Sequence, residues 1–81
     1  MVLNCITIKK VYSLSKSLSN NIRKLRFEAD EMSQQTLAEK VGVTRQTIIA
    51  IEKDKYSPSL EVAFKISDVF QKPLENIFKY K

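Results

Sequence analysis

Apolar positions spaced three and four residues apart run through most of the chain and predict short helices from residue 21 onward. Residues 1–19 carry no such stripe: they are rich in serine and β-branched residues and alternate only weakly. We expect this segment to be an arm that is extended, forms a short strand or is partly disordered. Residues 20–81 are expected to form one small helical domain.

Capping and turn residues divide the helical part into five predicted helices. These comprise residues 21–29, 34–41, 45–53, 60–70 and 74–78. Ser33, Thr44 and Ser59 each precede a helical stripe, where a side-chain oxygen can accept from a free N–H of the first turn. Gly42, the only glycine, is expected to end the second helix with a positive φ. Pro73 suits the first turn of the fifth helix.

The second and third predicted helices are joined by a turn of a few residues that contains the glycine. Such a pair is the geometry of a helix-turn-helix, although other helical bundles can produce the same pattern. On the fourth predicted helix, one face is formed by Leu60, Ala63, Phe64 and Ser67, with Ile66 and Phe70 beside it.

The third predicted helix contains adjacent isoleucines, which cannot both lie at the centre of one buried face. Ile48 shares a side with Ile51 and is expected to face the core. The other side and its edges carry Arg45, Gln46, Thr47, Ile49, Ala50 and Lys53. These groups match base-pair edges in the major groove, because arginine can bond guanine, glutamine can bond adenine, and small apolar groups pack on the thymine methyl. The alternative is that Ile49 packs on a neighbouring helix or a dimer partner.

The charge balance points to an anionic partner. Lys and Arg number 14 against 9 Asp and Glu, a formal charge of +5, which suggests nucleic acid or an anionic membrane surface. Many solvated domains carry a similar charge, so charge alone does not decide. No apolar run approaches the ~18 residues of a membrane span, and Lys9 and Lys10 interrupt any signal-peptide core. We therefore expect a cytoplasmic protein without a membrane partner.

Several chemistries are not expected for this chain. It has no histidine and a single cysteine, Cys5, which excludes an internal disulfide, histidine-based catalysis and His/Cys zinc sites. One domain of 81 residues is small for a core plus a deep catalytic cavity, and no nucleophile–base set, carboxylate pair or phosphate loop is visible. We expect no enzyme, metal, cofactor or small-molecule ligand.

The stretch SQQTLAEKVGVTRQTIIAIEKDKYSPSLEVAFKI, residues 33–66, resembles the Cro/C1-type helix-turn-helix of the xenobiotic-response-element family. The likeness is greatest to its short, stand-alone bacterial and archaeal regulators and extends over about residues 21–80. Its most specific pieces are Ser33-Gln34, Leu37-Ala38, Val41-Gly42-Val43, Arg45-Gln46-Thr47-Ile48, Ala50-Ile51-Glu52 and Tyr56-Ser57-Pro58-Ser59-Leu60. The resemblance implies an all-α, five-helix, lambda-repressor-like domain whose second motif helix enters the major groove.

The resemblance also implies roles for single residues. Base reading is expected from Arg45, Gln46, Ile49 and Ala50, with phosphate contact as the alternative for the first two. Contact with the DNA backbone is expected from Gln34, Thr44, Thr47, Lys53, Lys55 and Tyr56. For Gln34, free N–H groups at the start of its helix would help to bind a phosphate. Arg26 and Glu52 resemble a buried ion pair that ties the first helix to the recognition helix and sets its angle.

The chain departs from the family pattern at three places. Lys53-Asp54 replaces the usual Asn-Gly, so Asp54 is expected to accept a left-handed conformation at some cost. Gln71 stands where glycine is common, and most family members lack residues 1–19. The resemblance is therefore silent about the arm.

These observations predict a sequence-specific DNA-binding transcription regulator, a repressor that binds an inverted repeat of double-stranded DNA as a homodimer. The candidate dimer residues are Leu74, Ile77, Phe78 and Tyr80, together with the arm; alternatively, these residues only close the core of the monomer. A second hypothesis is an antitoxin or controller-type module that binds a partner protein as well as DNA, with residues 1–19 as its tail.

Overall fold

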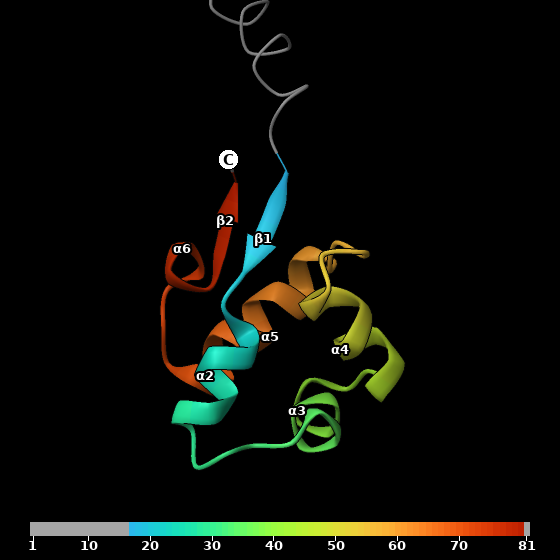
Figure 1. Cartoon of the computed structure of the whole chain (residues 1–81), viewed down its shortest axis with the longest axis vertical. Coiled ribbons are helices and arrows are strands. Elements are labelled where there is room, and N and C mark those ends of the chain that lie inside the picture. Colours follow the sequence, from blue (N-terminus) through green and yellow to red (C-terminus); the bar gives the residue numbers. More distant parts are fainter. Residues whose placement is uncertain (1–16, 81) are drawn as a thin grey trace, which may run out of the picture.

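The computed structural model describes residues 17–80, which form five helices and a two-stranded ribbon (Figure 1). In chain order the elements are β1 (Leu18–Asn20), α2 (Ile22–Glu28), α3 (Gln34–Val41), α4 (Arg45–Glu52), α5 (Leu60–Phe70), α6 (Leu74–Ile77) and β2 (Phe78–Tyr80). The five predicted helices are confirmed, each within two residues of its expected bounds. Most of the predicted arm, residues 1–16, lies outside the described residues. None of the described helices is long and apolar enough to cross a membrane.

The starts of three helices follow from the predicted caps. Ser33, Thr44 and Ser59 are all extended, and the side-chain oxygen of each accepts a hydrogen bond from the backbone N–H three residues later. Each bond satisfies one of the N–H groups that have no partner within the helix. The three predicted N-caps are therefore confirmed.

Each of the helices α3, α4 and α5 is followed by a residue in the left-handed conformation. Gly42 has φ +77°, as predicted, and Asp54 and Gln71 have φ values of +60° and +54°. In each case the residue after it donates its backbone N–H to a carbonyl of the last helical turn, the Schellman arrangement. Asp54 and Gln71 thus adopt the conformation that the family usually assigns to glycine.

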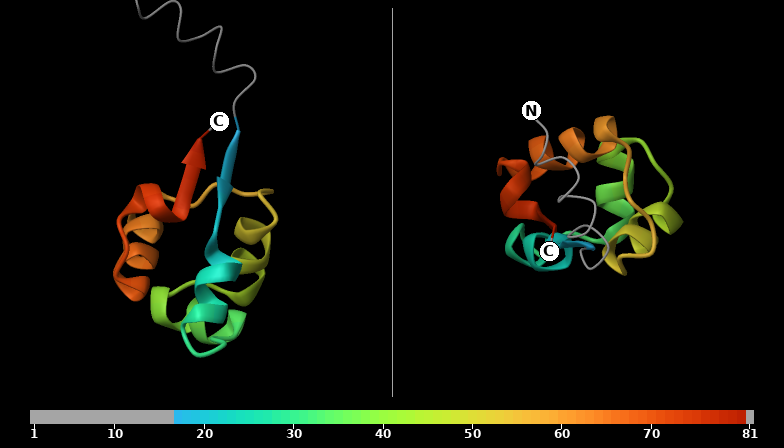
Figure 2. Two further views of the ribbon diagram at one scale, coloured as in Figure 1. Left: turned by 60° about the vertical axis from the view of Figure 1, so that its left-hand side comes forward. Right: turned by 90° about the horizontal axis from the view of Figure 1, so that it is seen from above.

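The core lies where the helices face a common centre, as seen from above in Figure 2. It is formed by Ile22, Leu25, Leu37, Ala38, Val41, Ile48, Ile51, Ile66 and Ile77. The predicted face of α5 is wrong, because Leu60 and Phe64 are 69% and 55% exposed while Ala63 and Ile66 are buried. Apolar residues occur on nearly every side of α5, so the sequence does not define which stripe faces inward.

The ribbon joins the two ends of the described chain. β1 pairs antiparallel with β2 in the register Leu18↔Tyr80, Ser19↔Lys79 and Asn20↔Phe78. The short N-terminal strand was one of the predicted alternatives, whereas β2 was not predicted, and Phe78 leaves the helix expected to contain it. The expected domain boundary between residues 19 and 20 falls within β1.

Candidate nucleic-acid interface

The second helix of the α3–turn–α4 unit is held against the core by one side. Ile48 and Ile51 are fully buried, and α3 packs against both α4 and α5. Gly42 ends α3 and Thr44 caps α4, so the turn between the two helices is short and fixed at both ends. This geometry presents the remaining sides of α4 outward.

The outward side of α4 is graded rather than uniformly exposed. Arg45 and Gln46 are exposed at its first turn, whereas Thr47, Ile49 and Ala50 are half-buried. Ile49 is therefore less exposed than its position on the outward side of the helix predicts. It lines a hollow of about 360 Å³ together with Arg23, Arg26, Gln34, Glu52 and Lys53. The hollow lies where α2, α3 and α4 meet, and neighbours from two other helices account for the reduced exposure.

Arg26 and Glu52 form an ion pair between α2 and α4. Arg26 Nε and Nη2 lie 2.6 and 3.1 Å from the two Glu52 carboxylate oxygens, with side chains 14% and 8% exposed. Arg26 Nη1 also donates to the Met32 carbonyl at 2.7 Å, and Gln34 Nε2 donates to Glu52 at 3.1 Å. A fork-to-fork pair of this kind fixes direction as well as distance. The network therefore ties α4 to α2 and to the start of α3.

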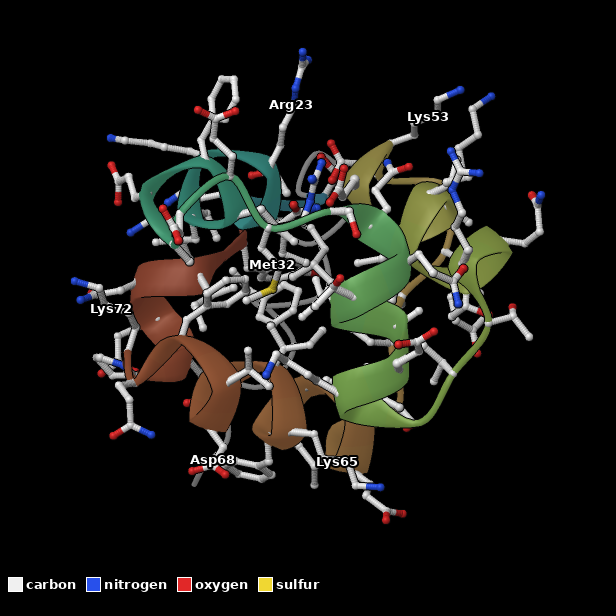
Figure 3. The ribbon with its side chains drawn as sticks, turned by 90° about the horizontal axis from the view of Figure 1, so that it is seen from below. Arg23, Met32, Lys53, Lys65, Asp68 and Lys72 are labelled. Atoms are coloured by element: carbon white, nitrogen blue, oxygen red, sulfur yellow. The ribbon has the colours of Figure 1, made fainter. Side chains whose placement is uncertain are left out.

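Gln34, Arg23 and Lys53 lie around this network. Gln34 is the first residue of α3 and is half-buried, and its amide is oriented by Glu52 rather than extending freely. Arg23 and Lys53 are exposed, and both side chains point away from the body on the side of α2 and α4, opposite Lys65 and Asp68 (Figure 3). Sequence reasoning gave Arg23 no role beyond facing outward.

The loop after α4 carries three exposed residues expected to contact the DNA backbone, Lys53, Lys55 and Tyr56. Its shape depends on the left-handed Asp54. Asn20, to which the sequence gave no role, bonds both the end of α4 and Asp54. A contact between residues more than 30 positions apart leaves no signal in local sequence patterns, which is why it was missed.

Exposed cations lie on the side of the molecule that carries α4. Residues 17–80 contain ten Lys and Arg and all nine Asp and Glu, so the described part carries a formal charge of only +1. The acidic Glu52 on α4 is neutralised by Arg26, while Arg23, Arg45 and Lys53 remain exposed on its side of the molecule. The arrangement of cations, not their excess, distinguishes this surface.

The four candidate dimer residues do not lie together at the surface. Ile77 is fully buried in the core. Leu74, Phe78 and Tyr80 line an apolar groove of about 430 Å³ between α5, α6 and the ribbon. The other residues of this groove are Leu18, Pro58, Leu60, Ala63, Glu75 and Lys79.

The compact helical unit, its short capped turn and the half-exposed polar side of α4 define a helix-turn-helix domain. A family model described as helix-turn-helix matches residues 22–77, more than half of the chain. The chain belongs to this family, in its Cro/C1 type, and is a DNA-binding transcription regulator of a family of non-enzymatic proteins.

Individual relatives agree with this assignment. An uncharacterized HTH-type transcriptional regulator of Methanocaldococcus jannaschii is 58% identical over 50 residues, or 62% of this chain and 76% of that protein. One of Bacillus subtilis is 46% identical over 61 residues, covering 75% and 91%. The cryptic phage CTXphi transcriptional repressor RstR of Vibrio cholerae is 36% identical over 59 residues, covering 73% and 52%. A crystal structure of a Bacteroides fragilis protein shares the fold, with a TM-score of 0.67 at 22% identity over 76% of this chain and 98% of that one.

Proposed function

We propose that the protein is a sequence-specific repressor that binds an inverted-repeat operator as a homodimer in the cytoplasm. The observation that carries this proposal is the outward side of α4, where exposed Arg45 and Gln46 stand beside half-buried Ile49 and Ala50. A helix fits the major groove of B-form DNA, and this mixture of a fork-shaped cation, an amide and small apolar groups complements base edges.

Roles follow from position on α4. Arg45 and Gln46, at its N-terminal turn, are proposed to bond guanine and adenine edges. Ile49 and Ala50 lie further along and are proposed to pack against thymine methyl groups or sugars. The hollow beside Ile49 leaves room for a methyl group to enter between α4 and Gln34.

The backbone contacts are proposed to surround these base contacts. Gln34 lies at the start of α3, where free N–H groups favour a phosphate, and Thr44 and Thr47 lie at the start of α4. Lys53 and Lys55, with Tyr56, extend the series beyond the end of α4. Contacts of this kind set register without reading sequence.

The apolar groove supports the proposed homodimer. It exposes Leu60 and Tyr80 beside Leu74 and Phe78, and apolar patches on small proteins commonly mark interaction sites. A twofold dimer would present two α4 helices to successive major grooves, about 34 Å apart. Repression by occupying a promoter is supported by the likeness to RstR, which is named as a repressor.

The deciding experiment is selection of duplexes from a random pool by the purified protein, followed by sequencing. We expect an enriched motif with two inverted half-sites, bound by two chains. Enrichment of a single asymmetric site in a 1:1 complex would contradict the homodimer, and a pool that stays random would contradict sequence-specific binding.

A second candidate is a module that binds a partner protein as well as DNA, of the antitoxin or controller kind. Phe64 on α5 favours it, because this side chain is 55% exposed and lies outside the groove proposed for the homodimer, where it could contact another protein. Purification of the protein from its native cells decides between the two: a stoichiometric second polypeptide supports the module, and a pure homodimer supports the repressor alone.

A further inference from the structure

Asp54 ends α4 in a backbone conformation that side chains disfavour. Its φ is +60°, its N–H donates to the Ile51 carbonyl at 3.0 Å, and the N–H of Lys55 donates to the Ala50 carbonyl at 2.9 Å. These two bonds close the last turn of α4 and set the direction in which the following loop leaves. Glycine usually occupies such a position because it has no Cβ.

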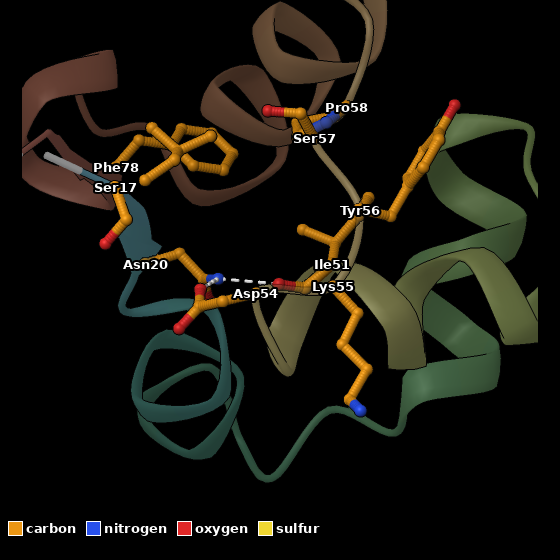
Figure 4. A pocket seen from close by; sticks show the side chains of 10 residues that line it. Ser17, Asn20, Ile51, Asp54, Lys55, Tyr56, Ser57, Pro58 and Phe78 are labelled. Atoms are coloured by element: carbon orange, nitrogen blue, oxygen red, sulfur yellow. Dashed lines mark hydrogen bonds between the residues drawn. The ribbon is translucent and has the colours of Figure 1, made fainter. Parts of the chain in front are cut away.

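Asn20 supports this unfavourable turn from the other end of the chain. Its Nδ2 donates to Asp54 Oδ1 at 3.0 Å and to the Ile51 carbonyl at 2.8 Å (Figure 4). Its Oδ1 accepts the Ile22 N–H at 3.1 Å. The amide has two donor hydrogens, one for each acceptor. One side chain therefore connects the start of α2, the end of α4 and the side chain of Asp54.

The carboxylate of Asp54 makes this connection possible. A glycine at residue 54 would adopt the same φ without help but would offer no group to Asn20. With Asp54, the strained residue is bonded to the β1–α2 junction, so the loop is fixed relative to the body of the domain. Arg26 ties α2 to the last residue of α4 through Glu52, and Asn20 ties the β1–α2 junction to the Ile51 carbonyl and to Asp54.

We propose that Asn20 is a positioning residue for the DNA-contacting loop, acting through Asp54 and the Ile51 carbonyl. It orients Lys53, Lys55 and Tyr56 for phosphate contact without touching DNA itself. This role in binding rests on the proposed function, whereas the fixing of the loop does not.

The first experiment measures the loop without DNA. Asn20→Asp keeps the acceptor for the Ile22 N–H but replaces Nδ2 and its two donor hydrogens with one oxygen that faces the Ile51 carbonyl and the Asp54 carboxylate. We expect the amides of Asp54 and Lys55 to exchange hydrogen at least about fivefold faster, as for two lost hydrogen bonds. Asn21→Ala is the matched control, because the Asn21 side chain donates only to the Asn76 carbonyl at 3.0 Å among described partners.

The amide of Val43, bonded to the Ala38 carbonyl at the end of α3, reports general loosening within the same sample. Equal acceleration at residues 43, 54 and 55 would overturn the proposal, as would unchanged exchange at residues 54 and 55. If Asn20→Asp does not fold, Asn20→Ala supplies the second comparison. Exchange at residues 54 and 55 should again be faster than in the wild type, and adding Asp54→Gly should slow it in part, since glycine needs no partner at this φ but does not replace the bond to the Ile51 carbonyl.

The second experiment measures binding to the selected duplex. Asn20→Asp should weaken binding about tenfold and lower the slope of log affinity against log salt by about 1, the value for one lost phosphate contact. Adding Asp54→Asn should recover part of this loss, because the swapped pair restores a donor opposite a carboxylate and asparagine tolerates the left-handed region, while the bond to the Ile51 carbonyl stays lost. If adding Asp54→Asn recovers no binding, Asn20 does not act through Asp54. If the wild type selects no duplex, the proposed function fails. The hydrogen-exchange rates of residues 54 and 55 still decide whether Asn20 fixes the loop.

Discussion

At the scale of single residues, the two adjacent isoleucines of α4 differ in their surroundings. Ile48 is fully buried among core residues, whereas Ile49 lines the hollow beside Gln34 and Lys53. Neighbouring residues of similar chemistry thus have separate consequences when they are shortened.

We expect Ile48→Ala to lower the free energy of unfolding by about 2–5 kcal/mol, because it leaves a cavity in the core. Ile49→Ala should cost about 1 kcal/mol or less, since only part of the side chain is covered. Denaturant titration of both variants measures this. A loss at Ile49 equal to that at Ile48 would contradict the assignment of faces.

The same Ile49→Ala variant should bind the selected duplex more weakly while binding random DNA unchanged. Replacement of thymine by uracil in the duplex removes the C5-methyl group that Ile49 is proposed to contact. We expect this replacement to weaken the wild type but not the variant. If uracil has no effect on the wild type, Ile49 contacts something other than a thymine methyl group.

The Arg26–Glu52 pair also has a testable effect on stability. Glu52→Ala should cost about 3 kcal/mol, because it leaves the charge of mostly buried Arg26 and the amide of Gln34 without their partner. Lys65→Ala is the control: it breaks the exposed Lys65–Glu61 pair on α5, 3.3 Å long, and should change stability by less than about 0.5 kcal/mol. Thermal or urea unfolding of the two variants makes the comparison, and similar losses would exclude a structural role for Glu52.

At the scale of elements, the turn between α3 and α4 depends on Gly42. A Cβ added at this residue meets no atom within 4 Å, so any cost of a substitution comes from its φ of +77° rather than from crowding. We expect Gly42→Ala to destabilise by about 1–2 kcal/mol, and Gly42→Asn by less, because asparagine tolerates the left-handed region. Urea titration of the two variants decides; equal losses would point to an effect other than backbone conformation.

The elements that could be predicted from sequence are those with local causes. Ser33, Thr44 and Ser59 act on N–H groups three residues away, and Gly42 acts on its own φ, so short windows suffice. β2 is three residues long and forms because β1 pairs with it. The two strands are far apart in the sequence, so the residues around β2 do not reveal this pairing.

The same difference between local and long-range causes decides which features of the candidate site could be predicted from the sequence. The outward residues of α4 follow from its period, so Arg45 and Gln46 were found at exposed positions. The partial cover of Ile49 comes from α2 and α3, and the contact of Asn20 with Asp54 spans 34 positions. Both depend on how the elements meet, not on their own sequences.

At the scale of the whole molecule, the formal charge is +5, of which residues 17–80 contribute only +1. Salt dependence should therefore come from individual cations. Lys55→Ala should lower the salt slope of DNA binding by about 1, whereas Lys65→Ala on α5 should leave it unchanged. Fluorescence-anisotropy titrations between low and moderate salt test this, and equal changes for both lysines would contradict a localised interface.

The apolar groove gives the prediction for assembly. Leu60→Lys should leave stability within about 0.5 kcal/mol, because Leu60 is 69% exposed, but it should weaken the dimer by placing a charge in the interface. Phe27→Lys, at a 67% exposed position of α2 outside the groove, is the control and should leave association unchanged. Sedimentation with and without operator DNA measures the association of both variants. A dimer that Leu60→Lys does not weaken would exclude the groove as the dimer interface.

The β1–β2 ribbon has a mechanical consequence. Leu18 pairs with Tyr80 and Asn20 with Phe78, so tension applied through residues 17 and 80 acts at the same end of the ribbon. The backbone bonds would then be loaded one after another, as in a zipper, rather than sharing the load in shear. The last position to be reached is Asn20, whose side chain holds the end of α4. A pull on the strands would therefore be transmitted to α4 only after the ribbon has peeled apart.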